Sequence, residues 1–199
     1  MNVLVIALRY LAVATLVTGV LYQGVVTLSA QWLFRSRAEG SLLADADGPR
    51  GSSLIGQADR HAGHFWGRPS ATSPAPYRAD ASGGSNLGPL HPELARAIAE
   101  RVAAWRASDS TQVAPIPVDL VTCSASGLDP HVSAAGALWQ VPRVARARGL
   151  APAAVEALVR RRIEPSFLGM IGAPRVNVLL LNRELDRASP ESAGTIMTE

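Results

Sequence analysis

The chain has 199 residues, 48% of them hydrophobic, and a net charge of +3, a length typical of one folded domain. All 19 basic residues are arginines. The absence of lysine excludes a Walker A phosphate loop and Schiff-base chemistry, because both need a lysine amine. The single cysteine, Cys123, permits no internal disulfide. Two local arginine clusters without interleaved aromatic residues do not indicate nucleic-acid binding.

The N-terminal segment predicts a transmembrane helix. No charged residue occurs from Tyr10 to Phe34, and a helix of this length reaches about 37 Å, more than the roughly 30 Å hydrocarbon core of a bilayer. A cleavable signal peptide is the alternative, but its apolar stretch usually runs only about 7–15 residues. We therefore expect an uncleaved anchor at residues 10–34. The flanking arginines do not decide its orientation, and we expect a cytoplasmic tail at 1–9 with the large domain exported.

The rest of the chain is predicted to be a linker, one domain and a tail. Residues 35–50 are rich in Gly, Ala and Asp and predict the linker, and residues 51–57 resemble a short strand. The domain is expected at 51–185. Residues 58–90 lack a regular pattern, and long irregular segments of this kind are usually functional or disordered. Residues 186–199 are expected to form a flexible tail.

Three helices and two further strands are predicted within the domain. Pro92 begins the first helix, and apolar residues recur at helical spacing along it. Ser133 is a candidate N-cap of the second helix, which Gly149 ends. Pro142 lies inside this helix and is expected to break or kink it. A third helix begins at Pro152. Apolar runs at 118–122 and 176–181 predict buried strands, so the fold class is α/β with one transmembrane helix before a small α/β domain.

Two motifs have both a chemical and a structural interpretation. His61 and His64, with Asp59 nearby, could belong to a metal site, but zinc needs three or four such ligands. Locally hydrogen-bonded histidines are the default expectation. The glycine-rich run at 82–89 (SGGSNLGP) could cradle an anion with its backbone N–H groups. A tight structural turn is the alternative for this run.

Two further clusters are candidate sites. Asp129 and His131 lie close to Ser126 and Ser133, and a hydrolase would need these groups to converge in space. Turn formation before the Ser133 cap is the other interpretation of these residues. Residues 64–70 (HFWGRPS) place an aromatic pair beside an arginine. This segment suits a partner-facing anchor, or else a loop that its aromatic side chains pin to the core.

The ordered set of motifs resembles a known family. After the apolar segment, the motifs occur at 53–57 (SLIGQ), 65–70 (FWGRPS), 82–89 (SGGSNLGP), 117–122 (PVDLVT), 126–131 (SGLDPH), 143–145 (RVA), 174–179 (PRVNVL) and 181–182 (LN). This order is similar to that of the C chains of Kdp-type potassium-transporting ATPases, from about residue 10 to residue 186. Local departures occur at 61–64, at Cys123 and Ala125, at Pro142, and at 164–166.

The resemblance implies an accessory subunit of a high-affinity, ATP-driven potassium import complex in the bacterial inner membrane. Its partners would be a channel-like potassium-binding subunit, a phosphorylated P-type ATPase subunit, a small single-span subunit and the lipid bilayer. The chain would have no catalytic residue, metal or covalent cofactor of its own. ATP would be associated with the complex, and the family role is a chaperone-like promotion of ATP binding by the ATPase subunit.

From the loops that carry these motifs we expect a set of residues that face a partner or ligand. The domain would cap the outer face of the channel-like subunit through the region 58–90. The expected residues are Trp66, Arg68, Ser82, Gly83, Gly84, Ser85, Asn86, Asp129 and His131. A membrane-anchored hydrolase and a metal-binding module remain the alternative functions.

Overall fold

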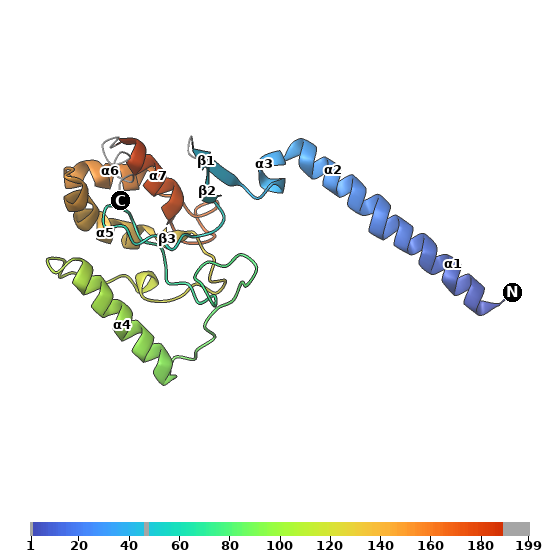
Figure 1. Ribbon diagram of the computed structural model, residues 1–199, viewed down its shortest axis with the longest axis horizontal. Coiled ribbons are helices and arrows are strands. Elements are labelled where there is room, and N and C mark those ends of the chain that lie inside the picture. The colour runs from blue at the N-terminus through green and yellow to red at the C-terminus, as the bar shows by residue number, and fades with distance from the viewer. Residues whose placement is uncertain (1, 46–47, 189–199) are drawn as a thin grey trace, which may run out of the picture. The chain divides into compact units, whose positions relative to one another are not determined.

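The computed structural model describes residues 2–45 and 48–188. These residues divide into two compact units, with the boundary between Ser52 and Ser53. The first unit contains an apolar helix and a β-hairpin, and the second is a mixed α/β domain (Figure 1). The α/β class predicted from the sequence is therefore confirmed.

One long apolar helix dominates the first unit. It consists of α1 (Val3–Thr15), a π-helical segment (Leu16–Tyr22) and α2 (Gln23–Leu33). An 18-residue window of this 31-residue helix reaches a mean hydropathy of 2.1, and no part of that window is buried inside the described structure. At 1.5 Å per residue the helix spans about 46 Å, which exceeds the thickness of a bilayer core. The helix is thus long and apolar enough to cross a membrane, and it begins before the charge-free window.

A hairpin occupies much of the predicted linker. The short helix α3 (Arg35–Ala38) precedes β1 (Leu42–Asp45), which pairs antiparallel with β2 (Gly48–Ser52). The strand predicted at 51–57 is wrong beyond Ser52, because the backbone there bonds to other segments. The carbonyl of Ser53 accepts a hydrogen bond from the Asn177 side chain, and the Gly56 N–H donates to the Leu128 carbonyl.

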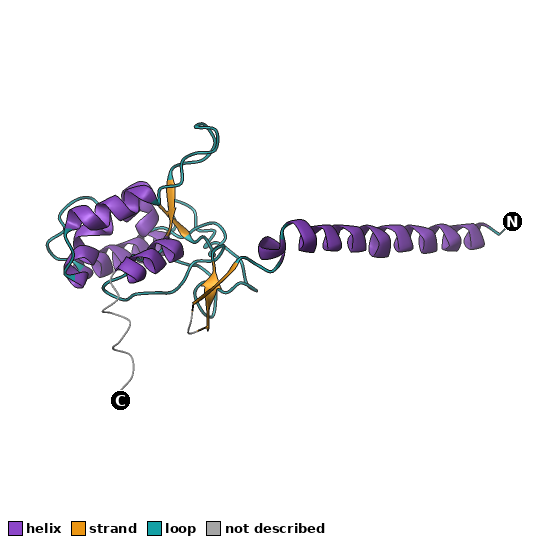
Figure 2. Cartoon of the chain, turned by 90° about the horizontal axis from the view of Figure 1, so that it is seen from above, coloured by secondary structure: helices purple, strands orange, loops and turns teal. Residues whose placement is uncertain are grey.

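The second unit packs four helices with one small strand pair (Figure 2). The helices are α4 (Pro92–Ser108), α5 (Ala134–Arg148), α6 (Pro152–Arg161) and α7 (Val178–Ala188). Strand β3 (His131–Ser133) pairs antiparallel with β4 (Arg175–Asn177), so that Val132 lies opposite Val176. Helices α5, α6 and α7 pack against one another in chain order. Of the predicted tail, 186–188 belong to α7 and 189–199 lie outside the described residues.

The boundaries of α5 follow the predicted capping residues, but Pro142 does not break the helix. The Ser133 hydroxyl accepts a hydrogen bond from Gly136 N at 2.9 Å, and Gly149 ends the helix with a φ of 64°, a conformation that glycine adopts without steric cost. Pro142 lies on the exposed side of the helix, where water can bond the carbonyl group that lost its partner. Burial of the opposite side offsets the cost of about 3 kcal/mol.

Both predicted strands of the domain are largely helical instead. Residues 118–122 begin as a 3-10 turn, Val118–Leu120, whose apolar side chain at Leu120 is buried. The strand expected at 176–181 ends at Asn177, because the Asn177 side chain accepts a hydrogen bond from Leu180 N at 3.1 Å. An asparagine in this position starts a helix by satisfying one of its free N–H groups. The following apolar run therefore forms α7, which buries Leu181 and Leu185.

The long irregular segment 58–90 is fixed to the helices by two side-chain amides. Asn182 on α7 accepts a hydrogen bond from Phe65 N at 2.8 Å and donates one to Phe65 O at 2.9 Å. Gln140 on α5 does the same for Trp66, at 2.8 and 3.0 Å. Both amides are almost fully buried. They satisfy two consecutive backbone units that no strand partner reaches.

The hydrophobic core lies between this clamped segment and the helices. Phe65 is fully buried at its centre, which confirms that the aromatic pair pins the loop to the core. The core is completed by Trp105, Leu120, Val121, Val132, Ala137, Trp139, Val141, Val144, Ala145, Val155, Leu158, Val159, Val176, Val178, Leu181 and Leu185.

Removing one amide of the clamp should destabilise the domain. In Asn182→Ala, the N–H and carbonyl groups of Phe65 lose their partners in a buried site, and we expect a loss of about 2–4 kcal/mol in the free energy of unfolding. Denaturant unfolding of the detergent-solubilised chain, followed by tryptophan fluorescence, measures this loss. Gln57→Ala is the control, because the Gln57 side chain bonds, within residues 2–45 and 48–188, only to Ile55 O in its own loop, at 3.4 Å. Equal losses in both variants would contradict the clamp.

Candidate functional site

A shallow polar groove brings together three of the predicted site residues. Arg68 donates to an Asp129 carboxylate oxygen at 3.4 Å and to the Cys123 carbonyl at 3.1 Å. Asp129 in turn contacts the His131 ring at 3.0 Å and accepts a hydrogen bond from His131 N. The groove has a volume of about 640 Å³. Its lining residues are Leu54, Arg68, Ser124, Ala125, Ser126, Leu128, Asp129, Pro130 and His131.

The electrostatics of this groove keep Asp129 ionised. Partial burial of the Asp129 carboxyl raises its pKa, but the hydrogen bonds from the His131 ring and backbone, together with the nearby charge of Arg68, outweigh burial and leave the pKa below its ordinary value. Hydrogen bonds to the charged form of a carboxyl group favour that form. The groove therefore presents a carboxylate held between an arginine and a histidine.

The glycine-rich loop packs beside this groove. The Ser82 hydroxyl and Gly83 N both donate to the Ser126 carbonyl, at 3.1 and 2.8 Å. A Cβ atom at Gly84 would lie only 2.8 Å from the Ala125 carbonyl oxygen, so glycine is required by close backbone approach. Residues 82–84 therefore have a structural role, because they pack directly against the backbone of residues 125 and 126.

The next two residues of the loop, Ser85 and Asn86, are exposed. Their side chains are thus accessible to a partner, and a partner-facing role for them stays a prediction.

Trp66 does not line the groove; its partly buried side chain packs against the hydrophobic core. Its ring contacts Trp105 at 4.8 Å between centroids, and the guanidinium of Arg143 lies 4.2 Å from its centroid. Its Nε1 donates to His61 O at 2.9 Å. Burial lowers the pKa of Arg143 to about 10, and this arginine donates to the carbonyls of Ala62 and His64. The stack holds the 61–66 turn on α5.

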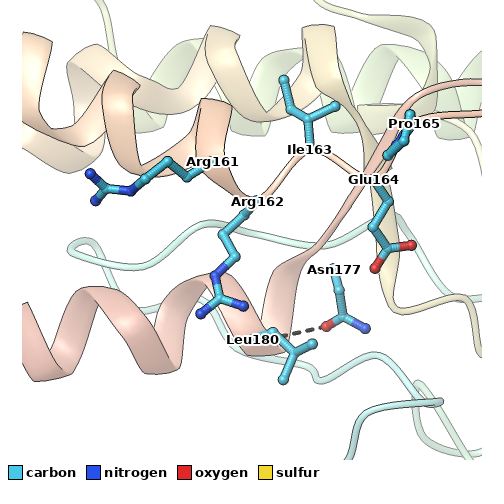
Figure 3. Close-up of a pocket in the computed structure, with 7 residues that line it drawn as sticks. All are labelled: Arg161, Arg162, Ile163, Glu164, Pro165, Asn177 and Leu180. Carbon is cyan, nitrogen blue, oxygen red and sulfur yellow. Dashed lines mark hydrogen bonds between the residues drawn. The ribbon is translucent and has the colours of Figure 1, made fainter.

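The structure adds a second cleft that sequence analysis missed (Figure 3). It encloses about 240 Å³ at the C-terminal end of α6 and the start of α7. Its lining residues are Arg161, Arg162, Ile163, Glu164, Pro165, Asn177 and Leu180. Glu164 approaches His131 to 3.8 Å and bonds Arg175 at 3.1 Å, so the two depressions share a polar boundary. The run of three arginines at 160–162 was the only sequence signal for this cleft.

The groove does not form a Ser-His-Asp triad among the described residues. Asp129 does orient the His131 ring, but the second ring nitrogen faces Glu164. The Ser126 hydroxyl accepts a hydrogen bond from Leu128 N, and the Ser133 hydroxyl is occupied by Asp119 and the helix cap. A triad needs a serine within hydrogen-bond reach of the free ring nitrogen, so this geometry gives the hydrolase alternative no support.

The His61 and His64 pair is used within the fold. The two nitrogens of His64 contact Asp59 at 2.5 Å and Asp186 at 2.9 Å, and the His61 ring lies 5.0 Å from that of His64. Arg148 also bonds Asp186, at 2.5 Å. Within 2–45 and 48–188, no three His, Cys, Asp or Glu side chains converge as metal ligands. The cluster ties the irregular segment to α7.

This cluster predicts that stability falls in mildly alkaline solution. The His64 ring donates hydrogen bonds to the carboxylates of Asp186 and Asp59, and these bonds raise the pKa of His64 to about 9, above its usual 6.5. The charged imidazole therefore stabilises the folded state fully below pH 6.5, and this contribution disappears as the pH rises through 9. Because its partners are partly exposed and solvent screens the interaction, we expect the charged His64 ring to contribute about 1–2 kcal/mol to the free energy of unfolding.

Denaturant unfolding at pH 6 and pH 10 measures this effect, with His64→Gln as the comparison. The variant should be less stable than the original chain at pH 6, and the difference should vanish at pH 10. A difference that is unchanged between the two pH values would contradict the role given to the charged ring.

The fold defines a class of protein, which is a small α/β domain carried behind a single candidate membrane helix. The family model described as KdpC, the c chain of K+-transporting ATPases, matches residues 4–187. The chain belongs to this family.

Curated relatives agree along almost the whole length. The potassium-transporting ATPase KdpC subunit of Polaromonas naphthalenivorans is 54% identical over 192 residues, which covers 96% of this chain and 98% of the relative. The KdpC subunit of Methylibium petroleiphilum is 56% identical over 176 residues, with 88% and 92% covered. That of Herpetosiphon aurantiacus is 52% identical over 181 residues, with 91% and 94% covered.

Proposed function

We propose that this chain is the accessory subunit of a high-affinity, ATP-driven potassium import complex, needed for its assembly and stability. It is anchored in the bacterial inner membrane by its apolar helix, with the α/β domain on the outer side. Its partners are a channel-like potassium-binding subunit, a P-type ATPase subunit and a small single-span subunit. The single observation that carries the proposal is the family match over residues 4–187.

The chemistry of the chain supports a role without catalysis of its own. The chain lacks the lysine that the phosphorylation motif of P-type ATPases contains. The charged groups of the groove are engaged with one another, as in the contact of Arg68 with Asp129. Groups locked in mutual hydrogen bonds suit recognition of a partner surface better than proton transfer to a substrate.

The groove and the glycine-rich loop are the surface that we propose for capping the channel-like subunit. Asp129, Arg68 and the exposed Ser85 and Asn86 come from two loops that bond to each other. The amide clamp on Phe65 and Trp66 makes this surface rigid before binding, which lowers the entropy that association costs. A rigid cap would favour one conformation of the outer face of its partner.

Any promotion of ATP binding would act at a distance. A domain outside the membrane does not meet cytoplasmic ATP, so the chain would raise the ATP affinity of the ATPase subunit through coupling between two sites. Such coupling is reciprocal, and it typically changes affinity by about 5–150-fold.

Growth under potassium limitation tests the proposal. A strain that lacks only this gene, with the other genes of the complex intact, should not grow at micromolar potassium, and the intact chain should restore growth. Arg68→Ala should reduce growth several-fold, because Arg68 joins two loops of the capping surface through Asp129 and the Cys123 carbonyl.

The matched control is Arg78→Ala, which removes a half-exposed arginine from the same segment. Among the residues that the structure describes, Arg78 forms an ion pair only with the exposed Asp80, so growth should stay unchanged. Full growth of the strain without the gene would refute the accessory role. Equal effects of the two variants would refute the capping surface but not the accessory role.

The distant coupling has its own test by reciprocity. If the chain raises the ATP affinity of the purified complex by some factor, then saturating ATP should tighten association of the chain by the same factor. Nucleotide titration with and without the chain, and association of the labelled chain with and without ATP, give the two factors. A large effect in one direction only would rule out equilibrium coupling.

A further inference from the structure

A narrow hairpin-like loop projects between α6 and β4. Residues 164–175, here called the finger, are closed at the base by paired backbone hydrogen bonds between Glu164 and Arg175, at 2.8 and 3.1 Å. A second pair joins Phe167 and Ile171 near the tip, at 2.9 and 3.0 Å. The finger extends beyond the helices as a thin double strand (Figure 2). Because these bonds satisfy the backbone within the loop, the tip needs no backbone partner from outside.

The finger exposes a contiguous apolar surface. Phe167 is 68% exposed, Leu168 74%, Met170 82% and Ile171 63%. No charged residue occurs between 165 and 174 (PSFLGMIGAP). Isolated exposed apolar residues are common, but four large ones at one tip mark a surface that binds a partner or a membrane.

The backbone conformation of the tip strengthens this inference. Leu168 and Gly169 have φ values of 52° and 73°, and Met170 N donates to Phe167 O at 3.2 Å to close the turn. Turns with positive φ at both central residues strongly favour Asn, Asp or Gly, and a bulky aliphatic residue is an outlier there. Leu168 is also exposed, so it contributes little packing within the domain. The conformational cost of a leucine at positive φ is explained if the Leu168 side chain is buried in a partner outside the domain.

The charges at the base of the finger identify the kind of surface it fits. Arg161 lines the cleft beside the base (Figure 3) and forms no ion pair among residues 2–45 and 48–188. Arg162, next in the chain, is paired with Glu184, and Arg175 at the base of the finger is paired with Glu164. An apolar tip with an excess cation at its base matches a bilayer surface, where acyl chains lie beneath anionic phosphates.

We propose that the finger inserts its apolar tip into the headgroup–acyl boundary of a lipid bilayer, with Arg161 at the level of the phosphates. The candidate membrane helix, Val3–Leu33, would tether the domain to the same bilayer. The roughly twenty residues between Leu33 and Ser53 would reach at most about 70 Å when extended, and they reach less when folded into α3 and the β1–β2 hairpin. Tethering makes the second contact intramolecular, so even a weak insertion is populated. The finger would thus set how the domain faces the membrane plane.

Depth-dependent fluorescence quenching in the full-length chain tests the insertion. Met170→Cys in a Cys123→Ser background is labelled with a polarity-sensitive fluorophore, and the chain is placed in nanodiscs of phosphatidylethanolamine and phosphatidylglycerol. We expect blue-shifted emission and several-fold quenching by spin-labelled lipids. The control label is Val113→Cys, an equally exposed apolar position in another loop (86%), which should stay unquenched.

A second variant separates docking from folding. Leu168→Asn removes the apolar side chain at the turn of the tip but places a residue that tolerates positive φ, so the unfolding temperature should not fall while quenching of the Met170→Cys label drops several-fold. Leu90→Asn, at a 96% exposed site outside the finger, should leave the quenching intact. Water-exposed emission at Met170→Cys, equal quenching at Val113→Cys, or shielding that appears only with companion subunits would each overturn lipid insertion.

Discussion

The second unit depends on how two buried amides hold the backbone of an irregular loop. Gln140 and Asn182 each form a donor and an acceptor bond to one residue, Trp66 or Phe65. A buried loop without strand partners would leave polar backbone groups unsatisfied, at about 1–3 kcal/mol each. With these bonds made, Phe65 can be fully buried at the centre of the core. The helices therefore fold around a loop that they themselves fix.

The same constraint orients the candidate site. The chain leaves the clamp at Trp66 and reaches Arg68 two residues later, where the arginine bonds Asp129. The turn that carries Asp129 leads into β3 and the Ser133 cap of α5, and α5 carries Gln140. The loop, the turn and the helix therefore support one another, because each contacts the other two. A surface supported in this way presents fixed charges, as suits the partner-binding role that we propose for it.

Local rules of capping and periodicity predicted the parts of the fold that depend on neighbouring residues. The membrane-length helix, the Pro92 and Pro152 starts, and the Ser133 and Gly149 caps follow from nearby residues alone. The apolar run at 176–181 was wrongly predicted as a strand, because buried strands and buried helices share the same composition. The hydrogen bond of the Asn177 side chain with Leu180 N starts the helix instead. Pro142 remained inside a helix because tertiary packing outweighed local propensity. The amide clamp could not be predicted from local sequence patterns, since it joins residues more than 70 positions apart.

Hydrogen exchange at the backbone amides of Phe65 and Trp66 tests the central claim most directly. If the two side-chain amides hold this loop, these N–H groups should exchange only on global unfolding, as slowly as the core of α5 and despite their irregular backbone. The exposed amides of the glycine-rich loop at Ser85 and Asn86 should exchange much faster. Exchange at Phe65 and Trp66 as fast as at those two positions would contradict the account.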